Sequence, residues 1–346
     1  MPNPFFFGGL VKHESYFVGR RNELRRIFAA LEIAHTGQLQ SYSVVGARRI
    51  GKSSLLYHVA QAHHRYLRHP AAYGFAYVDA TDARCETQAG LLGYILDSLH
   101  IAHDQPLSLA AFTQALERLG EARVSPVVCL DEFERLLKHP DQFPDAFFDG
   151  LRALMSANRI AFVTASHTSL AALSREGKLT SPFFNVFTLL ELGELSDAEA
   201  DELTDRGFAC DRLFSATERQ WMRRAGGTHP MKLQIAGSLL YEAKASRRVD
   251  WRALERDYRA QIEFVFGKPP AHWRGWVARA LETVRLLPHD IGRAILELLG
   301  RGDKASDRSQ WLIGFAVIVL VLAVAFGWIG LDAIRDWFQV LTGTKK

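Results

Sequence analysis

The sequence contains few cysteines, and they are not arranged as metal ligands are. Its 346 residues include only three, Cys85, Cys129 and Cys210. None has the paired spacing of a zinc site or the density of a disulfide framework. This excludes a disulfide-rich secreted domain and a cysteine-ligated metal centre, and it favours a reducing compartment. Internal repeats and low-complexity tracts are also lacking, which excludes a repeat protein.

Strong charge of one sign is lacking as well. The net charge is only +4, and no zinc finger, recognition helix or aromatic-basic RNA platform occurs. One basic group stands out: Arg223, Arg224, Arg247, Arg248 and Arg252. These arginines suggest nucleic-acid binding only weakly, and solvated helix faces or contacts with anionic lipid are the alternatives. The cluster His63, His64 and His69 has no acidic or cysteine partner nearby, so we expect a solvated helix end rather than a metal site.

Charge is completely absent from one long segment, residues 309–331. Within it, Trp311 to Ile329 is almost wholly apolar, and about 20 helical residues span the hydrocarbon layer of a bilayer. Trp311 and Trp328 stand near the two ends, where indole rings prefer the membrane interface. We therefore expect a linker at 301–310, a transmembrane helix at 311–331 and a short, partly amphipathic tail at 332–346. The alternative for the apolar run is a buried core helix.

The most informative segment that is present runs from Gly46 to Ser53 (GARRIGKS), which fits the pattern G-x-x-x-x-G-K-[ST]. An apolar run, Ser41 to Val45, precedes it, and a helical pattern, Ser53 to Ala62, follows it. In this context the loop wraps phosphates in backbone N–H groups, Lys52 reaches the β and γ phosphates and Ser53 binds Mg²⁺. The sequence predicts an ATP site that includes Gly46, Arg49, Gly51, Lys52, Ser53 and Ser54.

A second acidic motif follows the buried-strand run Val124 to Leu130. Asp131 at the end of such a strand is placed to hold Mg²⁺, and Glu132 to polarise the attacking water. The pair is typical of hydrolysing P-loop ATPases and predicts the catalytic residues Lys52, Asp131 and Glu132. A solvated Asp-Glu strand end is the alternative.

Two further strands, Phe75 to Asp79 and Ile160 to Ser166, support an α/β fold with a five-stranded parallel core. The helix Pro144 to Ala157 precedes the second of them. The strand Ile160 to Ser166 ends in polar residues: Thr164, Ser166 and, directly after it, His167. In this type of fold a side chain at that position contacts the γ-phosphate, and we assign this catalytic role to Ser166. Serine and threonine also simply end strands, which is the alternative.

Three segments give the chain a specific resemblance. They are Tyr16 to Leu24 (YFVGRRNEL), Ser181 to Asn185 (SPFFN) and Gly226 to Pro230 (GGTHP). Together with the P-loop, they resemble the STAND and archaeal ATPase group related to the AAA+ proteins, over residues 4–245. The resemblance implies a P-loop core followed by a helical lid. We place the core at 1–193, and the helical lid together with a helical partner-sensing region at 194–300. The resemblance also implies base or pocket contacts from Phe17, Val18, Gly19, Arg20, His229 and Pro230.

The chain departs from that group in its arginines. The lid has His229 and Lys232 where many AAA+ proteins have a sensor arginine. The candidates for an arginine finger that acts on a neighbouring subunit are Arg159 and Arg175. We therefore expect a slow nucleotide-gated switch rather than a ring motor.

The region after the core reads as helical. Ser196 with Glu199 resembles a capping box that opens a helix at Asp197 to Arg206. Further helices are expected at 249–266, 273–287 and 289–299, where the resembled group carries a partner-sensing module. The aromatic residues of this region, Phe264, Phe266, Trp273 and Trp276, are expected in the core, with an interface as the alternative.

Basic residues balance on the two sides of the apolar run, three before it and three after it, so they do not set its orientation. No signal-peptide pattern occurs, and ATP is cytoplasmic, so we expect a single-pass protein of the cell inner membrane with a cytoplasmic ATPase domain. The expected function is an ATP-hydrolysing, Mg²⁺-dependent switch in signalling, defence or assembly, with a protein partner or homo-oligomer. The alternatives are an origin-recognition-like or transposition-helper-like DNA-binding ATPase at the membrane, and an ATP-bound scaffold without turnover.

Overall fold

The computed structural model describes residues 3–33, 38–175, 181–205, 214–245 and 249–267. Residues 1–262 belong to one compact unit. The helices expected at 273–287 and 289–299, the linker 301–310, the apolar run 311–331 and the tail 332–346 lie outside the described residues. Within the described ranges, no helix is long and apolar enough to cross a membrane.

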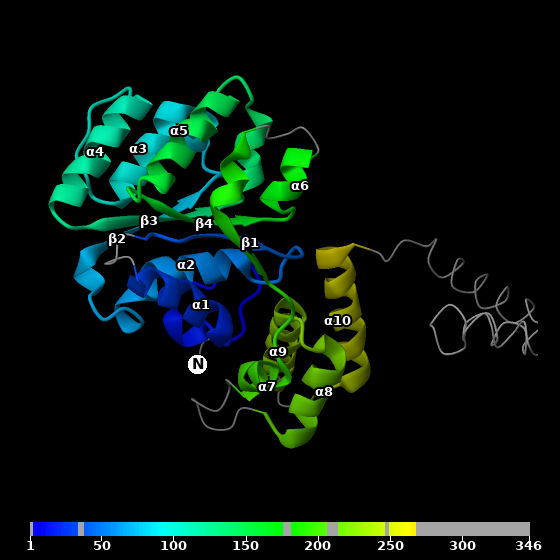
Figure 1. The fold of residues 1–346 in the computed structure, drawn as a ribbon. Coiled ribbons are helices and arrows are strands. Elements are labelled where there is room, and N and C mark those ends of the chain that lie inside the picture. The colour runs from blue at the N-terminus through cyan, green and yellow to red at the C-terminus, as the bar shows by residue number, and fades with distance from the viewer. Residues whose placement is uncertain (1–2, 34–37, 176–180, 206–213, 246–248, 268–346) are drawn as a thin grey trace, which may run out of the picture. The chain divides into compact units, whose positions relative to one another are not determined.

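A five-stranded parallel sheet forms the centre of this unit (Figure 1), as the sequence predicts. Its strands are β1 (Ser41–Val45), β2 (Tyr73–Asp79), β3 (Ser125–Asp131), β4 (Ala161–Ser166) and β5 (Phe187–Glu191). Their order is β2-β3-β4-β1-β5, and every neighbouring pair is parallel. Parallel strands end at the same edge, so the carboxyl ends of β1, β3 and β4 collect there. The fifth strand, β5, is the one that the sequence analysis did not locate.

The three central strands, β1, β3 and β4, are buried on both faces, which explains their continuous apolar runs. In β3, Val127 and Cys129 pack on one face of the sheet, whereas Val128 and Leu130 pack on the other. This alternation follows from the two-residue period of a strand. Cys85 is buried in the same hydrophobic core as Val128 and Leu130. Both faces therefore need covering layers.

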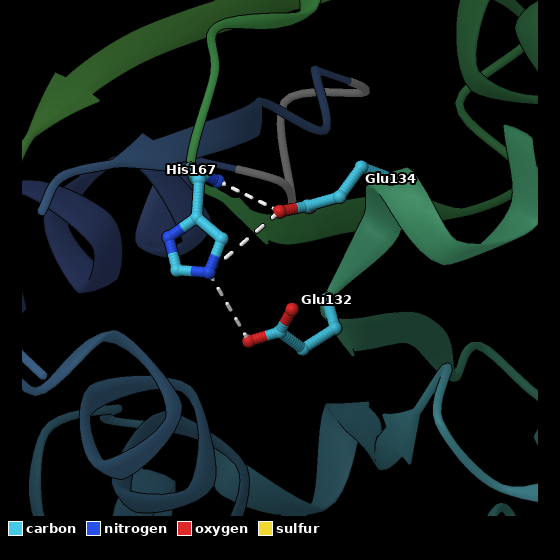
Figure 2. A group of neighbouring side chains, drawn as sticks. All are labelled: Glu132, Glu134 and His167. Atoms are coloured by element: carbon cyan, nitrogen blue, oxygen red, sulfur yellow. Dashed lines mark hydrogen bonds and ion pairs between the residues drawn. The ribbon is translucent and has the colours of Figure 1, made fainter. Parts of the chain in front are cut away.

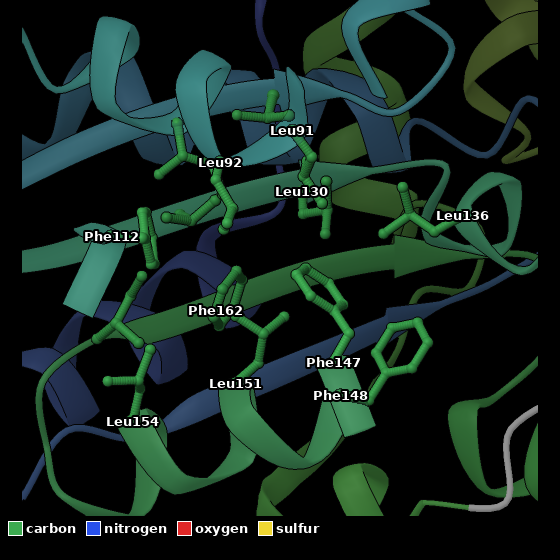
Figure 3. Close-up of a cluster of buried hydrophobic side chains, with 14 of the residues drawn as sticks. Leu91, Leu92, Phe112, Leu130, Leu136, Phe147, Phe148, Leu151, Leu154 and Phe162 are labelled. Atoms are coloured by element: carbon green, nitrogen blue, oxygen red, sulfur yellow. The ribbon is translucent and has the colours of Figure 1, made fainter. Parts of the chain in front are cut away.

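Helices supply both layers (Figure 1). One layer consists of α1 (Arg21–Glu32) and α2 (Lys52–Ala62), and the other of α3 (Gln88–Ser98), α4 (Leu109–Glu121), α5 (Asp145–Ser156) and α6 (Leu170–Arg175). In α5, Phe147, Phe148, Leu151, Leu154 and Met155 are buried, which is the stripe of an amphipathic helix. Figure 3 shows Phe147, Phe148, Leu151 and Leu154 packing with Phe112 of α4 and Phe162 of β4.

The connections contain short 3-10 helices. These are Glu14–Tyr16, His63–Arg65, Pro70–Ala72, Ala83–Glu86, Phe133–Lys138 and Pro182–Val186. His63 stacks on Phe75, with ring centroids 4.3 Å apart, and its Nδ1 lies 2.7 Å from the Ala60 carbonyl. His63 is therefore half-buried by packing, whereas the sequence predicts a solvated helix end.

The lid is helical and consists of α7 (Asp197–Asp205), α8 (Ala216–Gly226), α9 (Pro230–Ala245) and α10 (Trp251–Phe266). The capping box predicted at the start of α7 is present: the Ser196 backbone N–H donates to Glu199 Oε2, and the Glu199 N–H donates to Ser196 Oγ. Trp221 packs against Trp251 and Tyr258, which holds the start of α10 on α8. Arg223 pairs with Asp197 and Asp201, so this arginine neutralises lid carboxylates.

Candidate functional site

The loop between β1 and α2 has the backbone geometry that its glycines require. Gly51 has φ +100°, in the left-handed region that favours glycine. At Gly46, a Cβ atom would lie 2.5 Å from the carbonyl oxygen of Leu192, so no side chain fits there. The loop passes directly into α2 at Lys52, and the helix N-terminus faces the space that the loop surrounds. This arrangement suits an anion such as a phosphate.

The amino group of Lys52 is held inside this loop. It donates hydrogen bonds to the carbonyl oxygens of Gly46 (2.8 Å) and Ala47 (3.1 Å), and it lies 3.1 Å from Nδ1 of His167. Burial lowers the pKa of Lys52, against the opposing influence of nearby carboxylates, Glu132 first. The structure thus brings the P-loop lysine and the acidic motif together, as the sequence analysis predicts.

Asp131 ends β3 beside the start of α2. Its carboxylate accepts hydrogen bonds from the Tyr77 hydroxyl (3.0 Å), from the Glu132 backbone N–H (3.0 Å) and from the Ser53 hydroxyl. Burial nevertheless raises the pKa of Asp131. A buried carboxylate next to a serine hydroxyl is a hard oxygen pair that a bound Mg²⁺ would stabilise, so Ser53 and Asp131 fit the predicted metal role.

The next residues of the motif form a cluster with the loop after β4 (Figure 2). The His167 backbone N–H donates to Glu134 Oε1 at 3.0 Å, and the ring Nε2 lies 3.7 Å from Glu132 Oε1 and 3.9 Å from Glu134 Oε1. Glu132 has φ +51°, a left-handed conformation that costs energy in a residue with a side chain. The strain orients its carboxylate at the edge of the sheet, in contact range of His167.

Ser166 and Thr164, the other polar residues at this end of β4, lie differently. Ser166 is buried, and its hydroxyl donates to the Thr168 carbonyl at 2.7 Å. Thr164 is also buried, and its hydroxyl points to the Tyr42 carbonyl inside the sheet. Among these three residues, His167 is the one whose side chain reaches Lys52 and Glu132. The assignment of the γ-phosphate contact to Ser166 stays a prediction, and His167 is the stronger candidate.

The segment before α1 supports the P-loop. Arg20 is buried, and its Nη2 donates to the carbonyl oxygen of Ile50 at 2.8 Å, while Nη1 lies 3.5 Å from Glu23. Burial lowers its pKa. Gly19 has φ +73°, and a Cβ there would lie 2.9 Å from the Glu199 side chain of the lid. The segment expected to contact the base therefore also fixes the P-loop to the lid.

A pocket opens beside the P-loop and is lined by core and lid residues. Seven of the predicted nucleotide-binding residues line it: Phe17, Val18, Arg20, Arg49, Gly51, Ser54 and Pro230. Most of the lining is apolar, as the wall of a base-binding site is. One face of the Phe17 ring is covered by His58, with ring centroids 4.1 Å apart and the planes 7° from parallel. Several residues that are predicted to contact the base thus line one cavity, and their contact with a base stays a prediction.

The lid closes one side of this pocket at the start of α9. Pro230, Met231 and Gln234 line it. His229 is buried beside them, and burial together with Lys232 lowers its pKa. His229 does not line the pocket, so it supports the turn into α9, whereas Pro230 is placed for ligand contact.

Two parts of the site escaped the sequence analysis. Glu134 lies two residues after Glu132 and belongs to no recognised motif. Its closeness to Glu132 in the sequence is the one signal that could have identified it. The segment from Asn3 to Val11 also reaches the pocket, and its Phe6 and Val11 belong to the lining. The candidate arginine finger Arg159 pairs with Glu117 at 3.6 Å and precedes β4, at the sheet edge opposite the P-loop.

Comparisons with known proteins agree with this geometry. Residues 30–259 match the family model described as Novel STAND NTPase 2. No curated protein matches the chain. Similar solved structures include a Walker-type ATPase of Pyrococcus abyssi, with 16% identity and a TM-score of 0.58 over 88% of this chain and 90% of that one. The Aeropyrum pernix ORC2 protein in ADPNP-ADP complexes has 17% identity and a TM-score of 0.59, over 86% and 79%.

The Aeropyrum pernix ORC1 protein, solved in complex with DNA, has 18% identity and a TM-score of 0.50, over 87% of this chain and 77% of that one. These likenesses show that the chain shares the fold of these proteins. The family match spans the sheet, the P-loop, the acidic motif and the lid. The chain therefore belongs to the Novel STAND NTPase 2 family of P-loop nucleotide-binding proteins.

Proposed function

We propose that this protein is an ATP-hydrolysing, Mg²⁺-dependent switch that is anchored in a membrane. The observation that carries the proposal is the meeting of Lys52, His167 and Glu132 at one edge of the sheet, beside an apolar pocket. The P-loop N–H groups and Lys52 bind the phosphates, and the pocket takes the base. Ser53 and Asp131 would hold Mg²⁺, which would supply positive charge that neutralises the phosphates.

Glu132 acts as the general base. Its carboxylate, held at the sheet edge, accepts a proton from the water that attacks the γ-phosphorus atom. The bond from that phosphorus to the β–γ bridging oxygen breaks, and ADP and inorganic phosphate leave. Lys52 exchanges its bonds to the Gly46 and Ala47 carbonyls for bonds to the phosphate oxygens. His167, which lies between Lys52 and Glu132, orients both groups and contacts the γ-phosphate. The lid reports the state of the nucleotide through Pro230, which lines the pocket.

The membrane anchor is proposed on the sequence alone. The uncharged run at 309–331 has the length and composition of a single transmembrane helix. The need for ATP places the ATPase domain on the cytoplasmic side of the cell inner membrane. In this arrangement a common membrane plane raises the effective concentration of neighbouring copies, which favours ATP-dependent self-association.

One experiment separates this function from its two alternatives. The full chain in detergent is assayed for ATP hydrolysis with and without DNA, and its mass is measured in ADP and in a slowly hydrolysed ATP analogue. A switch hydrolyses ATP slowly, is not stimulated by DNA and is larger with the analogue than with ADP. Stimulation by DNA supports the DNA-binding ATPase, and retained nucleotide without turnover supports the scaffold.

A further inference from the structure

Residues 3–11 run from the lid to α2, the helix that follows the P-loop. We call this N-terminal segment the strap. At one end, the Asn3 side-chain amide donates to Ser238 Oγ of α9 at 2.8 Å. In the middle, the Phe6 backbone N–H donates to Gln234 Oε1, also on α9, at 3.1 Å. At the other end, the Val11 N–H donates to Ser54 Oγ of α2 at 3.1 Å. The strap thus connects the two walls of the nucleotide pocket.

Phe5 anchors the strap to the lid. Its side chain is 3% exposed and stacks on Phe214 with ring centroids 5.6 Å apart. It fits against Gly237 so closely that a Cβ there would lie 2.3 Å from the ring. A buried aromatic ring in a cradle that only glycine provides is a fixed attachment point. Phe5 therefore fixes the strap to α9 directly before Phe6.

Phe6, that next residue, has the opposite environment. Its ring is 51% exposed and forms part of the pocket wall that Phe17 also lines. Covering such an exposed apolar side chain at the mouth of a cavity with a ligand removes apolar surface from water, which is favourable. Gly8 and Gly9, whose Cβ positions lie within 3.4–3.9 Å of the Phe6 ring, leave it room. Three aromatic residues line the pocket, and Phe6 is the exposed one among them. Tyr16 and Phe17 are half-buried, and Phe17 has one face taken by His58.

We propose that Phe6 is a nucleobase-stacking residue and that the strap couples base binding to the position of the lid. The proposal rests on the proposed ATP site. A base that stacks on Phe6 removes apolar surface of both groups from water. Because Phe5 and the Phe6 N–H are both fixed to α9, stacking also holds the lid against the core. ATP then closes the site through its base as well as through its phosphates.

The test compares ATP with inorganic tripolyphosphate, which has the phosphates but no base. Affinities of the full chain in detergent are measured by calorimetry, with Mg²⁺ present. Phe6→Ala should weaken ATP binding about 5- to 100-fold, the cost of losing one base-aromatic stack, and should leave tripolyphosphate binding unchanged. Phe6→Tyr should restore ATP binding. Phe264→Ala, which removes another exposed phenylalanine, is the control and should change neither affinity.

Two outcomes overturn the proposal: ATP binding unchanged in Phe6→Ala, or equal weakening of both ligands. Lys52→Ala, which should weaken both ligands, identifies failure of the proposed ATP site itself. A second measurement uses Phe6→Trp. Its additional fluorescence should be quenched by ATP and not by tripolyphosphate at concentrations that displace ATP; equal quenching by both ligands also contradicts base stacking.

Discussion

The amino group of Lys52 and the imidazole of His167 lie 3.1 Å apart, and the other ring nitrogen of His167 faces the Glu132 carboxylate at 3.7 Å. One imidazole thus connects the phosphate-binding lysine to the proposed general base. The hydrogen bond from the His167 backbone N–H to the Glu134 carboxylate fixes the loop after β4 at this point.

We expect His167→Ala to lower kcat up to about 100-fold, because one polar contact to the developing phosphate charge is lost. ATP affinity should change little, since the P-loop is intact. Ser166→Ala is the matched comparison, because its hydroxyl is bonded to the Thr168 carbonyl. Steady-state ATPase kinetics measure both variants. A larger loss of kcat in Ser166→Ala than in His167→Ala would restore the role to Ser166.

Glu132→Gln should keep ATP binding and abolish turnover, at least a 100-fold loss on the scale of general-base catalysis. The amide has the shape of the carboxylate but does not accept the proton of water. Binding and single-turnover hydrolysis are measured on the same preparation. Glu134→Gln is the control, because its carboxylate accepts a backbone N–H of the loop after β4; it should keep part of the turnover. Equal turnover in Glu132→Gln and the wild type would refute the base assignment.

Arg20→Lys should destabilise the P-loop. The buried guanidinium donates to the Ile50 carbonyl and lies near Glu23, and a lysine ammonium does not match this fork geometry. We expect a loss of about 1–3 kcal/mol in the free energy of unfolding, together with weaker ATP binding. Arg25→Lys, on the exposed side of α1, is the control. Urea unfolding measures the difference, and equal stability of the two variants contradicts a structural role for Arg20.

His58 gives a pH dependence of known sign. Burial lowers its pKa in the folded state, so the unfolded chain binds a proton near pH 6.5 while the folded chain does not. The stability is therefore full above about pH 6.5 and falls as the pH drops below it. His58→Phe retains a ring against Phe17 and should lose less stability between pH 7.5 and 5.5 than the wild type does. Unfolding curves at both pH values measure this, with the exposed His64→Phe as control.

Deleting residues 311–346 should release the protein from membranes with ATP binding intact. The sheet, the P-loop and the lid helices all end by Phe266, well before the deleted residues. Fractionation after a high-salt wash, followed by a nucleotide-binding assay, checks the result. A truncated chain that still sediments with membranes would mean that another surface binds lipid.

The sequence predicted the parts of the molecule that have a local pattern. The run Ser41 to Val45 is β1 without change, and the P-loop and acidic motif lie where their spacing to strands placed them. The strand β5 was missed because Phe187–Glu191 follows a short 3-10 helix and has exposed residues, so it lacks a buried-strand run. The roles of Phe6, Glu134 and Arg20 depend on contacts across more than 25 residues of sequence, which no local pattern encodes.

The burial of two thiols has a practical consequence for spectroscopy. Cys85 and Cys129 lie in the core, and burial raises the pKa of Cys85 to about 12 and that of Cys129 further. Thiolate is the reactive form, so labelling reagents will spare both residues in the native protein. With Cys210 replaced by serine, a cysteine pair introduced at exposed sites of α1 and α8 would take two spin labels selectively. Their separation, measured by pulsed electron paramagnetic resonance, would then give the opening of the lid directly for each nucleotide.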